Sequence, residues 1–389
     1  MPGSLRDLLT RPESEAASVP AQASFAARLQ RDLLAWYAAC RRDLPWRRTR
    51  NPWAIWVSEI MLQQTRVDTV VPYFERFMAR FPTPLALAEA PEDQVLAAWS
   101  GLGYYRRARM LHAGARVVAA SEEMPTTRDA LLALPGIGRY TAGAIASIAF
   151  EEPVGLVDGN VARVLARIFA IDDDVRRSGM KRAEQLAEEL VPAESPGDWN
   201  QALMELGATI CTPRSPDCDR CPVAASCRAR AEGRVSELPV LGEKVKPKPQ
   251  RVQALVARTK DGRILLARRK SAGLFGGLWE PPSIDGDDAA TEDLFGRFPL
   301  TSTALAGQVT HVLSHRRLTV DVHAGVLSKV PVRPKLPDVY EAAGVFDEAG
   351  LADLGISTLA RKILRAASSA AETREPASGA AGRRPRRSR

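Results

Sequence analysis

The stretch Leu134-Pro-Gly-Ile-Gly-Arg-Tyr-Thr-Ala-Gly-Ala144 places a glycine hairpin directly before a run of small residues that should form a helix. Gly136 and Gly138 allow the backbone to turn with its amide groups exposed. Amides at the N-terminus of a helix can bind a phosphate group. An isolated Gly-x-Gly can also be a plain helix C-terminal turn, but the full pattern is typical of a helix-hairpin-helix motif, which predicts contact with the DNA backbone.

Upstream of the hairpin, residues 53–65 predict a largely buried helix that carries a carboxyl group. Glu59 and Gln63 are four residues apart and share one flank of this helix. A carboxyl group in such surroundings either pairs with an arginine or has a raised pKa suited to acid catalysis. The apolar positions that should bury the helix are Trp53, Trp56, Val57, Ile60, Met61 and Leu62.

Downstream of the hairpin, Asp158 lies in the sequence Val157-Asp-Gly-Asn-Val161, just before another helical pattern. This position suits the N-cap of that helix. A carboxylate held by helix amides also keeps its charge, so it could stabilise a cation. The two roles are compatible.

Four cysteines lie within seventeen residues, with the spacing Cys-x6-Cys-x2-Cys-x5-Cys over Cys211, Cys218, Cys221 and Cys227. Four thiolates bind soft metals or iron–sulfur clusters and leave no open coordination position. Zinc is chemically possible but more often uses two close cysteine pairs, so the spacing favours an iron–sulfur cluster. Disulfides fit least, because the chain shows no secretory context. The fifth cysteine, Cys40, lies in an apolar helical stretch and is expected to be a buried small hydrophobe.

The 389-residue chain is basic, with 54 Lys and Arg against 46 Asp and Glu and a net charge of +8. This charge suggests a polyanionic partner without establishing one. Half of the excess lies in Glu372–Arg389, where there are six Arg and two Glu. That tail is either a disordered solubilising end or a source of non-specific phosphate attraction. No stretch reads as a signal peptide or a membrane span, so we expect a soluble, cytoplasmic protein of bacterial type, associated with the nucleoid.

The length predicts two folded domains. The first is helical almost throughout, with proline-rich breaks between its helices. The second combines short β-type runs with a closing helix near Thr358–Ala367, which indicates an α+β fold. The predicted segments are a disordered N-terminus at 1–24, a helical domain at 25–228, a linker at 229–250, an α+β domain at 251–367 and a disordered basic tail at 368–389.

Six motifs follow one another in a recognisable order: Leu44–Arg47, Trp56–Thr65, Gly101–Tyr105, the glycine hairpin, Leu156–Asn160 and the four cysteines. This order resembles the MutY adenine DNA glycosylases, in the iron–sulfur branch of the helix-hairpin-helix glycosylases. The resemblance is close over roughly residues 28–228 and looser over 251–365. It implies a mostly α catalytic domain, with an iron–sulfur cluster loop at 211–227, followed by a Nudix-like domain.

The resemblance implies hydrolysis of the N-glycosidic bond of adenine mispaired with 8-oxoguanine or guanine, during base excision repair. Glu59 matches the acid that protonates the adenine ring and later handles the attacking water. Asp158 matches the carboxylate that stabilises the oxocarbenium-like sugar. Both roles fit the chemistry, because adenine is a poor leaving group until it is protonated and the sugar becomes cationic as the bond breaks. The adenine must leave the base stack to reach Glu59.

Tyr140 occupies the place where related strand-nicking enzymes carry a lysine nucleophile. A tyrosine cannot form a Schiff base with the sugar. We therefore predict a monofunctional glycosylase, with Tyr140 and Asn160 completing the catalytic set. One alternative is a bifunctional glycosylase and lyase for oxidised pyrimidines, which Tyr140 and the second domain oppose. The other is a damage-binding module in which Glu59 and Asp158 are only structural.

The resemblance also assigns DNA contacts. Tyr104 and Gln64 match residues that wedge into the duplex, and Thr65 and Leu102 match contacts to the oxidised guanine. Each of these residues has an ordinary role in the core or on the surface as its alternative. The full predicted set, including the lining of the adenine pocket, is Arg42, Leu44, Trp46, Arg47, Gln63, Gln64, Thr65, Leu102, Tyr104, Gly136, Gly138, Ser314 and His315.

The second domain is not expected to hydrolyse nucleotides. A Nudix hydrolase needs clustered glutamates to hold magnesium, and between residues 276 and 298 this chain has only Glu280 and Glu292. The recognition loop of the family carries Phe-Ser-His, where this chain has Leu313-Ser-His315. Ser314 can still hydrogen-bond the lesion, but Leu313 lacks an aromatic face for stacking.

The cofactors and partners follow from the same comparison of motifs. We expect one 4Fe–4S cluster on the four cysteines, and the resemblance implies a monovalent cation held by backbone carbonyls of residues 134–138. The expected partner is double-stranded DNA that contains an A:8-oxoguanine or A:G mispair. The protein should be a monomer without membrane contact.

Overall fold

The computed structural model describes residues 19–121, 123–242, 246–332 and 334–372. They fall into two compact units, bounded by Met1–Ala90 with Arg106–Lys244 and by Pro91–Tyr105 with Val245–Arg389. The second unit thus takes in a short segment from the middle of the helical sequence, which no sequence feature had indicated. Each unit is described by itself.

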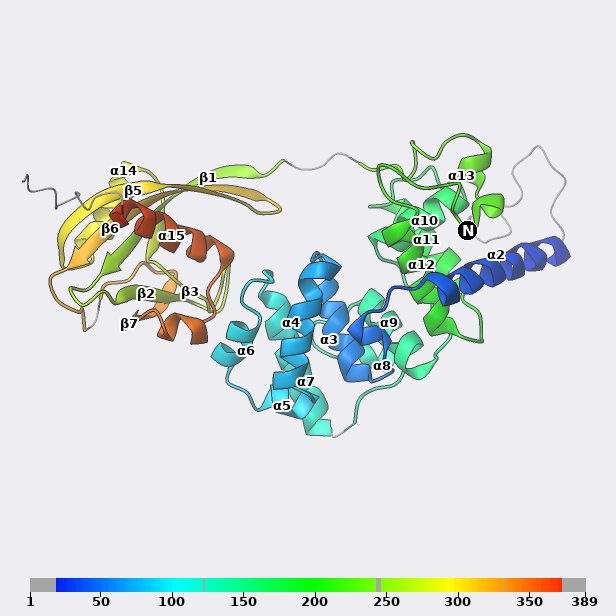
Figure 1. Cartoon of the computed structure of the whole chain (residues 1–389), viewed down its shortest axis with the longest axis horizontal. Helices are drawn as coiled ribbons and strands as arrows, with labels where there is room; N and C mark the ends of the chain where they lie inside the picture. Colours follow the sequence, from blue (N-terminus) through cyan, green and yellow to red (C-terminus); the bar gives the residue numbers. More distant parts are fainter. Residues whose placement is uncertain (1–18, 122, 243–245, 333, 373–389) are drawn as a thin grey trace, which may run out of the picture. The chain divides into compact units, whose positions relative to one another are not determined.

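The first unit is helical, as predicted. Proline marks the starts of several helices, where its missing N–H is no loss. The elements in Figure 1 are α2 (Val19–Cys40), η1 (Pro45–Arg47), α3 (Pro52–Leu62), α4 (Val67–Arg80), α5 (Pro84–Ala88), α7 (Arg106–Ser121), α8 (Arg128–Leu131), α9 (Arg139–Phe150), α10 (Gly159–Ile168), α11 (Ser178–Leu190), α12 (Pro196–Thr209), η2 (Ala224–Ser226) and α13 (Arg228–Ala231). None of the described helices is long and apolar enough to cross a membrane.

The predicted disordered ends are partly wrong. Residues 19–24 form the start of α2, and residues 368–372 continue the last helix of the chain. Alanine is the strongest helix former, so these alanine-rich stretches extend neighbouring helices despite their simple composition. Residues 1–18 and 373–389 lie outside the described residues. The predicted linker at 229–250 is also shorter at both ends, because α13 reaches Ala231 and the first strand starts at Lys248.

Helix α3 lies in the centre of the first unit. Its residues from Trp53 to Met61 are all buried, which confirms the predicted buried helix. Asn51 caps the helix by accepting hydrogen bonds from the N–H groups of Trp53 and Ala54. The small residues of α9 are buried as well, and at Gly143 a Cβ atom would lie only 3.1 Å from the carbonyl oxygen of Gly155. Small side chains therefore let the chain pack closely around α9.

Only one of the two hairpin glycines needs to be glycine for the turn. Gly136 has φ +78°, and a Cβ atom there would lie 2.4 Å from the Cβ of Met110. Gly138 has φ −97°, which any residue can adopt, and it is the N-cap of α9 without a side chain to bond the helix amides. The prediction that both glycines shape the turn holds for Gly136, whereas Gly138 leaves the start of α9 uncovered.

Cys40 is exposed at the last residue of α2, so its predicted burial is wrong. The buried positions of this helix are Leu29, Leu33 and Tyr37, which follow a spacing of four residues. One more step of four residues reaches position 41, so Cys40 lies outside this buried series. The apolar neighbours in sequence therefore did not indicate burial of the thiol.

The second unit is an α+β fold built on one sheet of order β3-β2-β1-β6-β5, in which β4 pairs with β1 and β7 with β2. Strands β1 and β6 are parallel, and the other pairs are antiparallel. The elements are α6 (Glu92–Ala98), β1 (Lys248–Arg258), β2 (Ile264–Arg269), β3 (Trp279–Glu280), β4 (Ser283–Asp285), α14 (Asp288–Gly296), β5 (Leu300–Val312), β6 (Arg316–Leu327), β7 (Tyr340–Phe346), η3 (Gly350–Asp353) and α15 (Thr358–Glu372).

Two apolar layers form the core of this unit, and the side chains of β1 alternate between them. Val252, Ala254 and Val256 pack with α15, whereas Leu255 and Ala257 pack with α14. Successive side chains of a strand point to opposite faces, so one buried strand can supply both layers. The predicted β-type runs and closing helix are confirmed.

Candidate functional site

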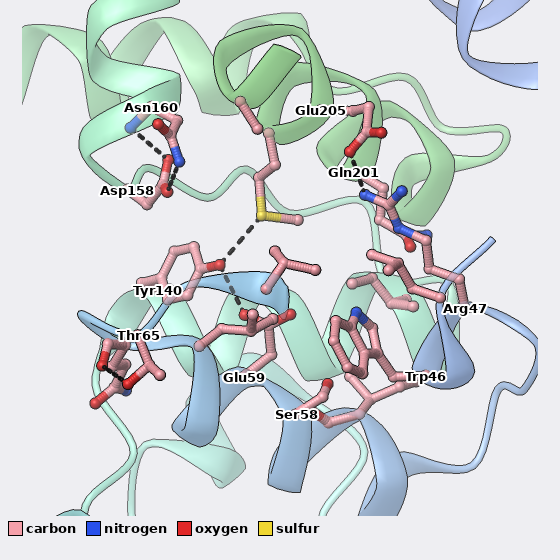
Figure 2. Close-up of a pocket in the computed structure, with 18 of the residues that line it drawn as sticks. Trp46, Arg47, Ser58, Glu59, Thr65, Tyr140, Asp158, Asn160, Gln201 and Glu205 are labelled. Carbon is pink, nitrogen blue, oxygen red and sulfur yellow. Dashed lines mark hydrogen bonds and ion pairs between the residues drawn. The ribbon is translucent and has the colours of Figure 1, made fainter. Parts of the chain in front are cut away.

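A cavity of about 520 Å³ opens beside the central helix of the first unit. Its walls come from residues 42–47, α3 and the turn that follows it, α9, the start of α10, and one face of α12 (Figure 2). The lining residues are Arg42, Leu44, Trp46, Arg47, Ile55, Ser58, Glu59, Leu62, Gln63, Gln64, Thr65, Val67, Tyr140, Ile148, Asp158, Gly159, Asn160, Gln201, Met204, Glu205 and Ala208.

Glu59 is buried in the wall of this cavity and is 5% exposed. The Tyr140 hydroxyl donates a hydrogen bond to its Oε2 at 2.7 Å and also lies 3.1 Å from the Sδ of Met204 (Figure 2). Burial raises the pKa of Glu59 to about 7, with the charge of Asp158 adding to the rise and the Tyr140 hydrogen bond opposing it. Near neutral pH a large share of Glu59 is therefore protonated and able to donate a proton.

Asp158 is the N-cap of α10, as predicted. Its Oδ1 accepts the N–H groups of Asn160 at 2.9 Å and Val161 at 2.7 Å, and its Oδ2 accepts the side-chain amide of Asn160 at 2.9 Å. Burial raises the pKa of Asp158, and these hydrogen bonds act in the opposite direction. Three donors fix the carboxylate in the cavity, so its charge is oriented in advance.

A third carboxylate, Glu205 of α12, closes another side of the cavity. Arg42 donates to both of its oxygens at 2.7 Å, and Arg47 donates to Oε2 at 2.8 Å. Burial alone would raise the pKa of Glu205, but the two arginines outweigh it and lower the pKa to about 2. At neutral pH Glu205 is therefore ionised and paired, whereas a large share of Glu59 is protonated. The surroundings of the two glutamates in the cavity thus give them very different pKa values.

The turn after α3 is held by Arg107 of α7. Its guanidinium donates to three backbone carbonyls, of residues 60, 61 and 63, at 2.5–2.9 Å. Carbonyls at a helix C-terminus lack helical partners, so this cation satisfies them. Gln64 has φ +59°, a left-handed conformation that is uncommon for a non-glycine residue. The Arg107 contacts hold this turn, whose residues Gln63, Gln64 and Thr65 line the cavity.

The four cysteine side chains surround a second, smaller cavity close to α10 and α13. Among the residues that the structure describes, no group of three or more His, Cys, Asp or Glu side chains is arranged to hold a single metal ion. Sulfur atoms placed around a cavity suit a cluster of several irons better than one tetrahedral zinc. The Arg167 guanidinium donates a hydrogen bond to the Cys211 sulfur at 3.2 Å. The residues present therefore fit an iron–sulfur cluster.

Three segments of the chain match described protein families. Residues 57–193 match the HhH-GPD superfamily base excision DNA repair proteins. Residues 211–227 match the iron–sulfur binding domain of endonuclease III, and residues 253–366 match the NUDIX domain. The four cysteines accordingly form an iron–sulfur site.

Similarity over most of the chain decides the family. The adenine DNA glycosylase of Rattus norvegicus is 40% identical, over 79% of this chain and 72% of the relative. The adenine DNA glycosylase of Homo sapiens is 38% identical, over 86% of this chain and 72% of the relative. This chain belongs to the adenine DNA glycosylase family. A solved structure of a thermostable thymine-DNA glycosylase is also similar, with 31% identity over 55% of this chain and 99% of the other and a TM-score of 0.50.

The structure of this glycosylase brings most of the predicted site residues together. All four predicted catalytic residues line one cavity, although residues 59 and 158 are far apart in the sequence. The predicted adenine-pocket and turn residues that line it with them are Arg42, Leu44, Trp46, Arg47, Gln63, Gln64 and Thr65. Arg42 and Arg47, however, donate their hydrogen bonds to Glu205. Their first role is therefore to order the side of the cavity that Glu205 forms.

The other predicted DNA contacts do not line the cavity. Gly136 and Gly138 lie in the hairpin before α9. Leu102, Tyr104, Ser314 and His315 belong to the second unit of the glycosylase, where Leu102 is buried and Tyr104 is 52% exposed. Ser314 and His315 are exposed in the turn between β5 and β6, where a partner can reach them.

Sequence reasoning missed the contribution of α12 to the cavity. Gln201, Met204, Glu205 and Ala208 are spaced at i, i+3, i+4 and i+7, which places them on one helix face. Two polar residues on a face that packs inward are a usable signal for a site. The spacing on α12 alone, however, does not indicate that Arg42 and Arg47 pair with Glu205.

Among the described residues of the second unit, Glu280 and Glu292 do not form a group that could hold a metal ion. Glu280 is buried, and it accepts hydrogen bonds from Arg269 at 2.6 Å and from the hydroxyl groups of Tyr340 and Ser283 at 2.7 and 3.1 Å. Glu292 is exposed on α14. Glu280 is paired with Arg269, so its carboxylate is not free to bind magnesium, as a Nudix hydrolase would require.

Glu59→Gln should stabilise the folded protein above neutral pH. The pKa of Glu59 is about 7 in the folded chain, against an ordinary value of 4.5, so the unfolded chain loses this proton first. The stability present below pH 4.5 is therefore lost as the pH rises to about 7, by up to about 3 kcal/mol. Gln cannot ionise and still accepts the Tyr140 hydrogen bond. The thermal midpoint of the variant should exceed that of the parent at pH 8 and match it near pH 4.5.

Glu205→Gln is the matched control, because the sign is opposite. With a folded pKa of about 2, the Glu205 carboxylate contributes stability above its ordinary value of 4.5 that is lost only as the pH falls toward 2. Its removal should lower the midpoint at pH 8. A Glu59→Gln protein no more stable than its parent at pH 8 would contradict a buried, proton-holding Glu59.

Proposed function

We propose that this adenine DNA glycosylase excises adenine mispaired with 8-oxoguanine or guanine in double-stranded DNA, and that it does so without cutting the strand. The observation that carries the proposal is the pairing of a proton-holding Glu59 with a fixed Asp158 in one cavity, beside Tyr140. Removal of adenine needs an acid for the base and an anion for the sugar. The cavity contains both.

The first step is entry of the flipped adenine into the cavity. Its volume of about 520 Å³ falls in the range of sites that bind small molecules. A base inside it reaches groups that are buried from solvent, so the reaction takes place where electrostatic effects are strong. Glu59 then donates its proton to the adenine ring, which turns the base into a good leaving group.

As the glycosidic bond breaks, the sugar becomes cationic. Asp158 lies ready with its charge oriented by three hydrogen-bond donors and stabilises this cation without rearrangement. Glu59, having given up its proton, then accepts one from the attacking water. Tyr140 holds Glu59 in place throughout by donating to it.

The finer features of the proposal concern the cofactors and the DNA contacts. The iron–sulfur site holds a 4Fe–4S cluster, and carbonyls of residues 134–138 hold a monovalent cation. The uncovered N-terminus of α9 binds a DNA phosphate. Ser314 and His315 contact the base opposite adenine, and the protein acts as a monomer. The exposure of the β5–β6 turn and the absence of a capping side chain at Gly138 support these assignments.

The reaction should leave the DNA strand intact. Tyr140 is a phenol whose pKa is raised by burial, and it has no amine to attack the sugar. With a duplex carrying adenine opposite 8-oxoguanine, we expect free adenine, an abasic strand of full length and no borohydride-trapped protein–DNA adduct. A trapped adduct in good yield would contradict the monofunctional reaction. Tyr140→Lys tests the position itself and is the variant in which trapping becomes chemically possible.

A further inference from the structure

The segment Gly101–Tyr105 is a strained turn in the second unit. Gly101, Gly103 and Tyr104 all have positive φ angles, of 109°, 73° and 49°. The positive φ of Tyr104 is a conformation that a glycine adopts at lower cost, and the residue is nevertheless 52% exposed. Such a turn persists only where its surroundings hold it in place.

A single backbone carbonyl holds both ends of this turn. The carbonyl oxygen of Ile356 accepts the Ser100 hydroxyl at 3.0 Å and the Tyr105 hydroxyl at 2.9 Å. The Tyr105 hydroxyl in turn accepts the N–H of Gly101 at 3.3 Å, and Arg361 of α15 donates to the Ser100 hydroxyl at 2.9 Å. We call these hydrogen bonds the Ile356 contact.

The chain around Ile356 is itself fixed to the sheet. Ile356 bridges to Trp279 of β3, whose N–H donates to the Gly355 carbonyl at 2.9 Å. At Gly355 a Cβ atom would lie 2.9 Å from the Cβ of Leu96 in α6, so the missing side chain lets this part of the chain pack closely against α6. The turn is therefore attached to the same sheet that carries the β5–β6 turn with Ser314.

We propose that Ser100 and Tyr105 are positioning residues. They connect the turn Gly101–Tyr105, which we call the Tyr104 turn, to the domain that contacts the base opposite adenine. This inference rests on the proposed function, in which Ser314 contacts the base opposite adenine, and on the predicted wedging of Tyr104 into the duplex. Binding energy gained at 8-oxoguanine then holds the Tyr104 turn in its wedging position. Guanine provides less of that energy, so the Ile356 contact contributes to the preference for 8-oxoguanine.

The test is the ratio of single-turnover rates of adenine release from A:8-oxoguanine and A:G duplexes. Tyr105→Phe and Ser100→Ala each remove one hydroxyl and little volume. In each variant the ratio should fall by about threefold to tenfold, the effect of a lost hydrogen bond, mainly through the 8-oxoguanine duplex. Gly355→Val places a side chain against Leu96 of α6 and should act in the same direction.

Tyr340→Phe is the matched control. It removes a hydroxyl that is buried in the same unit but bonded to Glu280 and Ser283. It should lower the thermal midpoint and leave the ratio unchanged. An unchanged ratio in Tyr105→Phe and Ser100→Ala, or an equal fall in Tyr340→Phe, would overturn the inference alone. A wild-type protein that releases no adenine, or shows no preference between the duplexes, would overturn the proposed function and the inference with it.

Discussion

Glu59→Gln should lower the single-turnover rate of adenine release from an A:8-oxoguanine duplex by about a hundredfold to ten-thousandfold. The reason is that adenine leaves only after protonation, and an amide cannot replace the acid. A pKa of about 7 makes Glu59 a proton donor matched to neutral pH. Because Gln keeps the shape of the side chain and still accepts from Tyr140, the cavity itself should persist.

The measurement is free adenine produced with enzyme in excess over duplex, together with the affinity for the same duplex. Affinity should change by less than about threefold, since the change removes a group that acts in the transition state. Ser58→Ala changes a neighbouring residue of the same cavity and should release adenine at nearly the parental rate. If Glu59→Gln releases adenine normally, the assignment of the acid is wrong.

Asp158→Asn should lower the same rate by about a hundredfold to a thousandfold, as the loss of one oriented charge in a buried site does. In the proposed reaction the carboxylate stabilises the sugar as it becomes cationic, and an amide cannot supply that charge. Asn is as good an N-cap as Asp, so α10 should keep its start and the protein its stability. Charge and capping are thereby separated in one substitution.

Asp158→Ala completes this comparison. It removes the charge and the cap together, so it should also lower stability by about 1 kcal/mol. Thermal melts and rates measured on both variants distinguish the two roles. A fully active Asp158→Asn protein would leave Asp158 with the structural role alone, which is the damage-binding alternative for this residue.

Local sequence patterns predicted those parts of the structure that depend on neighbours in the chain. Asp158 caps a helix because its side chain accepts hydrogen bonds from the amides two and three residues later. This contact is local, so the sequence predicts it. The buried helix around Glu59 follows from apolar residues on all its sides. The alternation of β1 likewise follows from the strand period.

What the sequence could not provide depends on contacts between distant segments. Arg42 and Arg47 are held in place by ion pairs with Glu205, which is more than 150 residues away in the sequence, and no local pattern links them. Cys40 seemed buried because its neighbours are apolar, but the helix turns it outward. The attachment of Pro91–Tyr105 to the second unit depends on contacts with distant segments, among them the Ile356 carbonyl, Gly355 and Arg361.

The most direct test of the central proposal compares three duplexes that differ only in the base opposite adenine. With wild-type protein in excess, free adenine should appear rapidly from the 8-oxoguanine duplex, more slowly from the guanine duplex and not detectably from the thymine duplex. Each reacted strand should remain uncut. No adenine from either mispair, or equal release from the A:T duplex, would contradict the proposal.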